Sequence, residues 1–322
     1  MRQRTIRGRL TAIIVAAAVC AGSVIAQQGN GSGNGGKQKD DEGAGDIYVH
    51  GKNPKDGDAP TAGTTGTLSA IINHGGPVMS SPTAYLIWYG NWSQSNGSDT
   101  SAGQGLVRTF LSGIGGTPYF MINSSHDGGY GGVTGGASLS PLEYADTGSQ
   151  GKRLSDNAIK TIVTNAINSG QLGPADPTGV YFVLTSSDIA KTGFCNQYCG
   201  WHTYATIKGM PIKYSFVGNA NRCLNSCAAQ TISPNGNAGV DGMISVVAHE
   251  LEEATTDPQL NAWYDNSGAE NADKCAWTFG SAQTLLPGGA YYNMTVGGKK
   301  FLVQRNLQAN TNKCYVAANG QQ

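Results

Sequence analysis

The run from Gly239 to Pro258 limits the possible folds of this chain more strongly than any other part of its sequence, because its pattern predicts a helix with charge on its buried face. Asp241 is expected as the N-cap, and Pro258 marks the end of the helix. At 100° per residue the apolar side chains share one arc, and these are Met243, Ile244, Val246, Val247, Leu251 and Ala254. Glu250 falls inside this arc. A buried carboxylate is costly unless a cation, a metal ion or hydrogen-bond donors meet it, so the fold must supply such a partner.

His249 and Glu253 lie four residues apart, at the edge of the same arc, whereas Glu252 is expected to point to solvent. The zincin motif H-E-x-x-H uses this geometry, with two ligands one turn apart and a glutamate that acts as general base. Here the motif is H-E-x-x-E, and a carboxylate oxygen can ligate zinc as an imidazole does. The run therefore predicts a zinc site with ligands His249 and Glu253 and with Glu250 as the catalytic base. The alternative is a His-Glu pair satisfied inside a structural core without metal.

Such a site needs at least one more ligand, and several acids follow the helix. Asp257 lies eight residues after His249 on the same helical face and is taken as the third ligand, although its position also fits an ordinary helix-end residue. Asp265 and Asp273 are further candidates in the segment that follows. His202 is a reserve ligand, for which the role of a core histidine is slightly favoured. The sequence leaves the choice among these four residues open.

The first 26 residues have the pattern of a secretory signal peptide: four arginines, then an apolar run, then a small residue at Ala26. No later apolar run is long enough for a membrane span, so no membrane contact is expected after cleavage. We expect the mature protein to be secreted into an extracellular, periplasmic or cell-wall space. Its six cysteines predict three disulfides, with the pairing left open, and these are Cys195, Cys199, Cys223, Cys227, Cys275 and Cys314.

Residues 27–66 consist mostly of Gly, Asn, Lys, Asp and Thr and predict a disordered linker, because they cannot bury a core. Removal of the signal peptide leaves 17 basic and 21 acidic residues. No cluster of Lys and Arg remains to contact phosphates, so nucleic acid is not an expected partner.

Residues 67–322 predict a single disulfide-bonded domain of α/β or α+β class, with a mixed sheet and packed helices. Strands are expected at 83–89, 179–185, 213–217 and 299–304. A short helix is expected around Leu106, Val107 and Phe110, and a second begins after the cap Ser155 and ends at Gly170.

In combination, these residues resemble the EXORDIUM family, also called phosphate-induced protein 1, which is best known as secreted plant proteins of the cell-wall space. The resemblance rests on residues 74–79, 85–93, 194–200, 239–258, 261–264 and 301–304. It implies export and a single disulfide-bonded domain, and it places the H-E-x-x-E helix within the family's own pattern. It supplies no reaction. Residues 102–156 are richer in glycine than the family pattern, and the linker at 27–66 is not a family feature.

Two functions from different classes fit this sequence. The first is a secreted zincin-type metallohydrolase that acts on peptide bonds, since the order of helix, strand, Cys-bridged segment and His-Glu helix is similar, by analogy, to zincin architecture. The second is a non-catalytic module that binds a cell-wall or extracellular-matrix polymer, or another protein, through exposed aromatic side chains and Gly-rich loops. The first predicts bound metal, and the second predicts a fold that tolerates Glu250→Gln.

Overall fold

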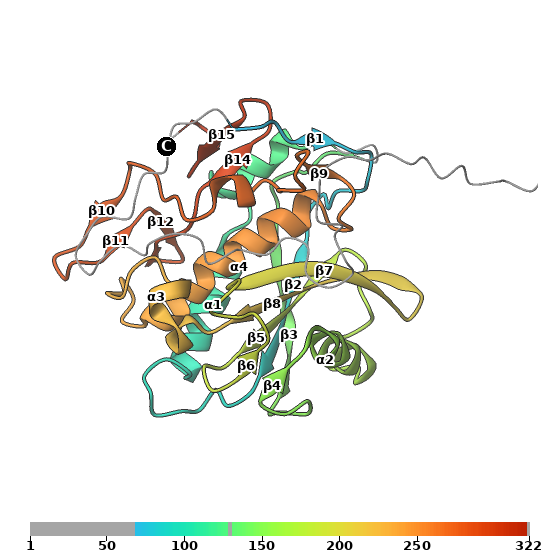
Figure 1. The fold of residues 1–322 in the computed structure, drawn as a ribbon, viewed down its shortest axis with the longest axis vertical. Helices are drawn as coiled ribbons and strands as arrows, with labels where there is room; N and C mark the ends of the chain where they lie inside the picture. The colour runs from blue at the N-terminus through green and yellow to red at the C-terminus, as the bar shows by residue number, and fades with distance from the viewer. Residues whose placement is uncertain (1–67, 128–130, 321–322) are drawn as a thin grey trace, which may run out of the picture. The chain divides into compact units, whose positions relative to one another are not determined.

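The computed structural model describes residues 68–127 and 131–320, whose main feature is a five-stranded mixed sheet (Figure 1). The strand order is β3-β2-β5-β8-β7, with β7 antiparallel at one edge and the other strands parallel. These strands are β2 Thr83–Tyr89, β3 Ser138–Asp146, β5 Gly179–Thr185, β7 Gly200–Ile207 and β8 Met210–Gly218. The predicted α/β class with a mixed sheet is confirmed. The predicted signal peptide at 1–26 and linker at 27–66 lie outside the described residues.

Helices cover both faces of this sheet. Helix α2 (Asp156–Asn168) packs on β5 and β8, while α1 (Ser101–Gly113) and α4 (Ala238–Thr256) contact each other and pack against the sheet through β3, β7 and β8 (Figure 1). Because both faces are covered, the inner strands read as continuous apolar runs rather than as alternating ones. As predicted, the side chain of Ser155 caps α2 by accepting a hydrogen bond from the backbone N–H of Ala158.

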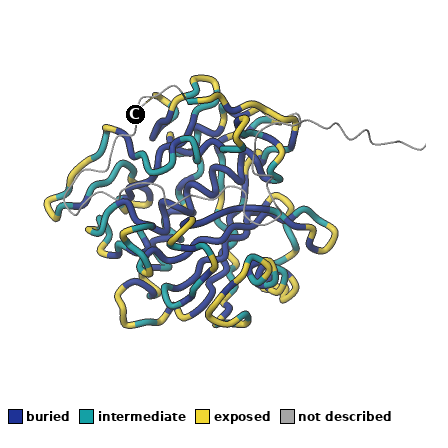
Figure 2. Tube along the Cα trace, viewed as in Figure 1, coloured by how far each residue is buried: buried dark blue, intermediate teal, exposed yellow. Residues whose placement is uncertain are grey.

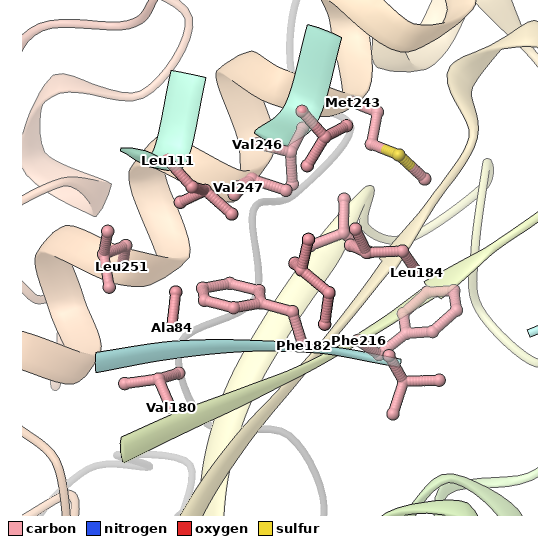
Figure 3. Packing of buried hydrophobic residues seen from close by; sticks show 14 of the residues in the cluster. Ala84, Leu111, Val180, Phe182, Leu184, Phe216, Met243, Val246, Val247 and Leu251 are labelled. Atoms are coloured by element: carbon pink, nitrogen blue, oxygen red, sulfur yellow. The ribbon is translucent and has the colours of Figure 1, made fainter. Parts of the chain in front are cut away.

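The core lies between the sheet and α4. Figure 3 shows Phe182 of β5 on the sheet side of this core, with Val246 and Val247 of α4 on the helix side, and all three are at most 1% exposed. Figure 2 shows the same region as a continuous buried band along the sheet and α4. Full burial of one such side chain contributes about 1.5–3 kcal/mol, so this interface fixes α4 on the sheet.

Short elements complete the described chain. The two-stranded pairs are β1 (Ile72–Asn73) with β9 (Trp263–Tyr264), β4 (Arg153–Leu154) with β6 (Ala190–Lys191), β10 (Thr284–Leu285) with β11 (Tyr291–Tyr292), β12 (Met294–Val296) with β13 (Lys299–Phe301), and β14 (Asn306–Gln308) with β15 (Lys313–Tyr315). The short helical turns are η1 (Phe120–Ser125), η2 (Ala220–Arg222), α3 (Leu224–Cys227) and η3 (Asp273–Cys275).

Helix α4 is buried on all sides, which corrects the expectation that Glu252 points to solvent. Its side chain is 0% exposed, because Asn123 of η1 and Asn306 of β14 lie against the face of α4 that does not meet the sheet. Nδ2 of Asn306 donates to Oε2 of Glu252 at 2.5 Å. The helical wheel predicted one buried face and one solvent-exposed face for α4. In the structure, segments that follow α4 in the chain pack against the second face and bury it as well.

Two predicted boundaries are also wrong. The N-cap of α4 is Asn237, whose side chain accepts the N–H of Val240, whereas Asp241 lies in the first turn and accepts a hydrogen bond from Asn235. The strand expected at 299–304 ends at Phe301, because the N–H of Gln304 bonds to the hydroxyl of Ser245 on α4 instead of continuing a ladder.

Three disulfides are present, as predicted. They join Cys195 to Cys223, Cys199 to Cys227 and Cys275 to Cys314. Such bonds are typical of proteins that reach an oxidising compartment. In the part of the chain that the structure describes, no helix combines the length and apolarity that a membrane crossing requires.

Candidate metal centre

The site forms where the edge strand β7 meets the second half of α4. A Cβ atom on Gly200 would lie 2.6 Å from Cγ1 of Val246 and 3.0 Å from Oε1 of Glu250. Only a glycine therefore allows this close approach of strand and helix. Two residues further along β7, His202 is 0% exposed and faces the acidic side chains of α4.

One group of potential ligands joins α4 to the turn η3. Nε2 of His249 lies 2.9 Å from Oε1 of Glu253 and 3.5 Å from Oδ1 of Asp273. The backbone N–H of Asp273 donates to Oε1 of Glu253 at 2.9 Å, which fixes the η3 segment against the helix. The three ligand atoms lie within 4.8 Å of one another, as the ligands of one metal ion do.

A second group shares Glu253 with the first. Nδ1 of His202 lies 3.5 Å from Oε2 of Glu253 and 3.6 Å from Oε2 of Glu250. These ligand atoms also lie within 4.8 Å of one another. Glu253 thus faces a different histidine with each of its carboxylate oxygens.

Several of these atoms lack a hydrogen-bond partner among the described residues. They include both carboxylate oxygens of Glu250, Oε2 of Glu253, Nδ1 of His202 and both ring nitrogens of His249. His249 approaches Glu253 closely, but without the alignment of a hydrogen bond. Buried polar groups normally have such partners, so this cluster requires compensating positive charge, and its nitrogen and oxygen donors are of the kinds that a metal ion binds.

The electrostatics of the two histidines follow from their carboxylate neighbours. Burial lowers the pKa of His249, but Glu253 and Asp273 outweigh it and raise the pKa to about 9. Burial also lowers the pKa of His202, and Glu250 and Glu253 raise it to about 9. The site therefore attracts positive charge, either as protons on the imidazoles or as a metal ion.

The acids respond in opposite directions. Burial raises the pKa of Glu250 well above its ordinary value, and His202 offsets only part of this effect. Burial also raises the pKa of Glu253, but His249 and His202 outweigh burial and hold it at about 2. Glu253, the residue common to both groups, is therefore the carboxylate whose ionised form the cluster favours most strongly.

The candidate ligands from the sequence now have definite places. Asp257, the expected third ligand, is the C-cap of α4, and its Oδ1 accepts the N–H groups of Asn261 and Ala262. Neither group includes it. Asp265 pairs with Lys274, and Asp273 instead lies beside His249. A helical wheel cannot predict the position of Asp273, because Asp273 lies beyond the end of α4 and reaches His249 only after the chain has turned back toward the helix.

His202 and Glu270 are the residues that the sequence interpretation undervalued. The sequence favoured a core role for His202, which agrees with its complete burial, and the side chain also contacts two carboxylates of α4. Glu270 was not singled out, and its Oε1 lies 3.6 Å from Nε2 of His202. The available signal was the position of His202 shortly after Cys199, whose disulfide to Cys227 fixes the start of β7 beside α4.

Comparison with known proteins gives a consistent result. The "Phosphate-induced protein 1 conserved region" matches residues 138–317, more than half of the chain. Protein EXORDIUM-like 5 of Arabidopsis thaliana is 31% identical over 286 residues, which cover 75% of this chain and 76% of that protein. Protein EXORDIUM-like 3 of the same plant is 31% identical over 281 residues, with 74% and 80% covered.

Protein PHOSPHATE-INDUCED 1 of Nicotiana tabacum is 30% identical over 168 residues, which cover 42% of this chain and 53% of the tobacco protein. No solved structure matches. The matched segment contains β7, α4 and η3, and hence every residue of the two ligand groups. The chain therefore belongs to the EXORDIUM and phosphate-induced protein 1 family.

Proposed function

We propose that this chain is an exported zinc-dependent hydrolase of zincin type. His249, Glu253 and Asp273 hold the ion, and Asp273 takes the role that the sequence gave to Asp257. The observation that carries the proposal is the convergence of one imidazole and two carboxylates, with the His249 and Glu253 side chains fully buried and without aligned hydrogen bonds between them. Export is supported by the three disulfides and by the signal-peptide pattern of residues 1–26.

The donor set favours zinc over harder cations. Calcium and magnesium prefer sites made only of oxygen, whereas imidazole suits zinc. All six cysteines of the described residues are in disulfides, so the closed thiolate type of structural zinc site does not apply here. Three nitrogen and oxygen ligands with a fourth position for water are typical of catalytic zinc.

Glu250 is the general base in this proposal. A bound zinc ion would lower the pKa of water and polarise a substrate carbonyl. Glu250 follows His249 directly on α4, and its carboxylate has no hydrogen-bond partner among the described residues. The positive charge of a bound ion would oppose the effect of burial on the pKa of Glu250 and favour its ionised form, which would take a proton from water and return it to the leaving group. Of the three ligands, Asp273 has the most exposed side chain, at 16%, and it marks the side from which substrate would enter.

The substrate class is a peptide, by the analogy to zincins, with an extracellular polymer as the alternative. The second candidate function is a non-catalytic extracellular module with a structural metal ion. It is favoured by the complete burial of His249, Glu250 and Glu253, which leaves a substrate little access in this conformation. In the aromatic run of β2, Trp88 and Tyr89 are buried and give this module no binding surface, whereas Tyr85 is half-buried.

The test combines zinc content with peptide hydrolysis. Residues 27–322 are prepared with disulfides intact, dialysed against zinc-free buffer and assayed on a peptide library. We expect hydrolysis that falls at least about 100-fold in Glu250→Gln with zinc retained, because loss of a general base costs this much. His249→Ala should lose both zinc and hydrolysis. Bound zinc without hydrolysis would favour the structural role, and absence of zinc would refute both metal roles.

A further inference from the structure

We propose a second divalent-cation site beside the first, formed by Nδ1 of His202, Oε2 of Glu250 and Oε2 of Glu253. The inference rests on the proposed function, because the two sites share Glu253. It adds regulation, since an ion in the second site would engage Glu250, the general base of the first.

The two oxygens of Glu253 point to different histidines. Oε1 lies 2.9 Å from Nε2 of His249, and Oε2 lies 3.5 Å from Nδ1 of His202. A carboxylate in this position bridges two ions, and two-metal sites in hydrolases hold their ions about 3.5–4 Å apart. The two ligand groups, each compact enough for one ion, have only Glu253 in common.

His202 is oriented as a metal ligand. With Nδ1 facing Glu250 and Glu253, its other nitrogen, Nε2, lies 3.4 Å from the backbone carbonyl of Asp257 and 3.6 Å from Oε1 of Glu270. Ligand histidines almost always donate their second N–H to a carbonyl or a carboxylate, which fixes the tautomer. Asp257 and Glu270 supply both kinds of acceptor, and Nδ1 is left to bind the ion.

The second group is also buried without internal compensation. Nδ1 of His202, both oxygens of Glu250 and Oε2 of Glu253 have no hydrogen-bond partner among the described residues, and all three side chains are 0% exposed. The unpartnered ligand atoms of the second group lie within 4.8 Å of one another. Their burial and their lack of partners distinguish this group from a cluster of exposed acidic side chains.

The second ion should bind more weakly than the first. Glu253 already serves the first ion, two divalent cations repel each other, and the contacts of the second group are longer, at 3.5–3.6 Å against 2.9 Å for the closest pair of the first. The first site should therefore fill at low zinc. Occupation of the second site would then bind the carboxylate of Glu250, which could no longer take a proton from water.

Zinc binding measured by equilibrium dialysis and elemental mass spectrometry tests this inference without an activity assay. The full mature chain is titrated with zinc at neutral pH. We expect one zinc per chain at low zinc and two at saturation, and one at saturation in His202→Ala and in Glu250→Gln. Glu250→Gln is the conservative variant, and it keeps the test valid if His202→Ala does not fold. His74→Ala is the matched control, because His74 is exposed, stacks on Tyr264 and belongs to neither ligand group. The His74→Ala variant should still bind two zinc ions.

The outcomes separate this inference from the proposed function. One zinc at saturation in the unaltered chain would overturn the second site and leave the proposed hydrolase intact. Two zinc ions that both persist in Glu250→Gln and in folded His202→Ala would also overturn it, because the second ion would then lie elsewhere. No zinc at any concentration would overturn both proposals.

Discussion

The disulfide Cys199–Cys227 should stabilise the fold less than its loop length alone suggests. Its partners are separated by 28 residues, but Cys195–Cys223, with the same separation, lies directly beside it. While Cys195–Cys223 is intact, breaking Cys199–Cys227 releases only a loop of about ten residues, made of 195–199 and 223–227. The loop-closure entropy then gives a cost of about 2.7 kcal/mol, against about 3.6 kcal/mol if it were the only bond in the segment.

The comparison bond is Cys275–Cys314, which spans 39 residues and has no neighbouring disulfide. The same relation gives about 3.9 kcal/mol for its loss. The assay is urea unfolding of paired Cys→Ala variants, with a chelator present so that metal binding does not contribute. The variant without Cys199–Cys227 should be the more stable of the two by about 1 kcal/mol. The reasoning is refuted if it is the less stable one, because native packing rather than chain entropy would then set the cost.

Further predictions concern Gly200, His126 and Glu252. Gly200→Ala should lower the free energy of unfolding in urea by about 1–3 kcal/mol, because the new Cβ would lie 3.0 Å from both Glu250 and a backbone carbonyl of the sheet. Gly105→Ala is the control, since open space surrounds Gly105 in α1, and it should be neutral or stabilising. Equal effects of the two substitutions would contradict the contact argument. Burial lowers the pKa of His126 from 6.5 to about 4, so between pH 7 and pH 4 the unfolded chain binds a proton that the folded chain does not, and the free energy of unfolding should fall by about 3 kcal/mol over this range. His126→Phe should reduce this pH dependence. An unchanged slope in the variant would exclude His126 as its source. Burial raises the pKa of Glu252 well above its ordinary value and favours the neutral form of the side chain, so Glu252→Gln should change the free energy of unfolding by less than about 1 kcal/mol. A loss of more than about 3 kcal/mol would show that the carboxylate is ionised.

Local sequence rules found the elements whose cause is local. The Ser155 cap and the apolar spacing of α2 predicted that helix, and the continuous apolar runs predicted β2 and β5. The H-E-x-x-E spacing predicted that His249 and Glu253 meet on one face of α4, and they do. Each of these predictions depends only on residues within a few turns or within one strand.

The sequence interpretation is least informative where distant segments decide the outcome. Glu252 is buried because η1 and β14 lie against the outer face of α4, and a helical wheel contains no information on that packing. Asp257 follows the period of the helix, but the helix ends there and its carboxylate caps the following turn. Asp273 reaches His249 only after the chain has turned back, so its role required the tertiary fold.

The measurement that tests the metal centre most directly is the zinc content of three purified forms, namely the unaltered mature chain, Asp273→Asn and Asp257→Asn. Each form is offered zinc at neutral pH, dialysed against zinc-free buffer and analysed by elemental mass spectrometry. We expect one zinc per chain in the unaltered protein and in Asp257→Asn, since an amide oxygen can still accept the N–H groups that Asp257 binds. Asp273→Asn should lose it. Zinc retained in Asp273→Asn but lost in Asp257→Asn, or no zinc in the unaltered chain, would contradict the proposed centre.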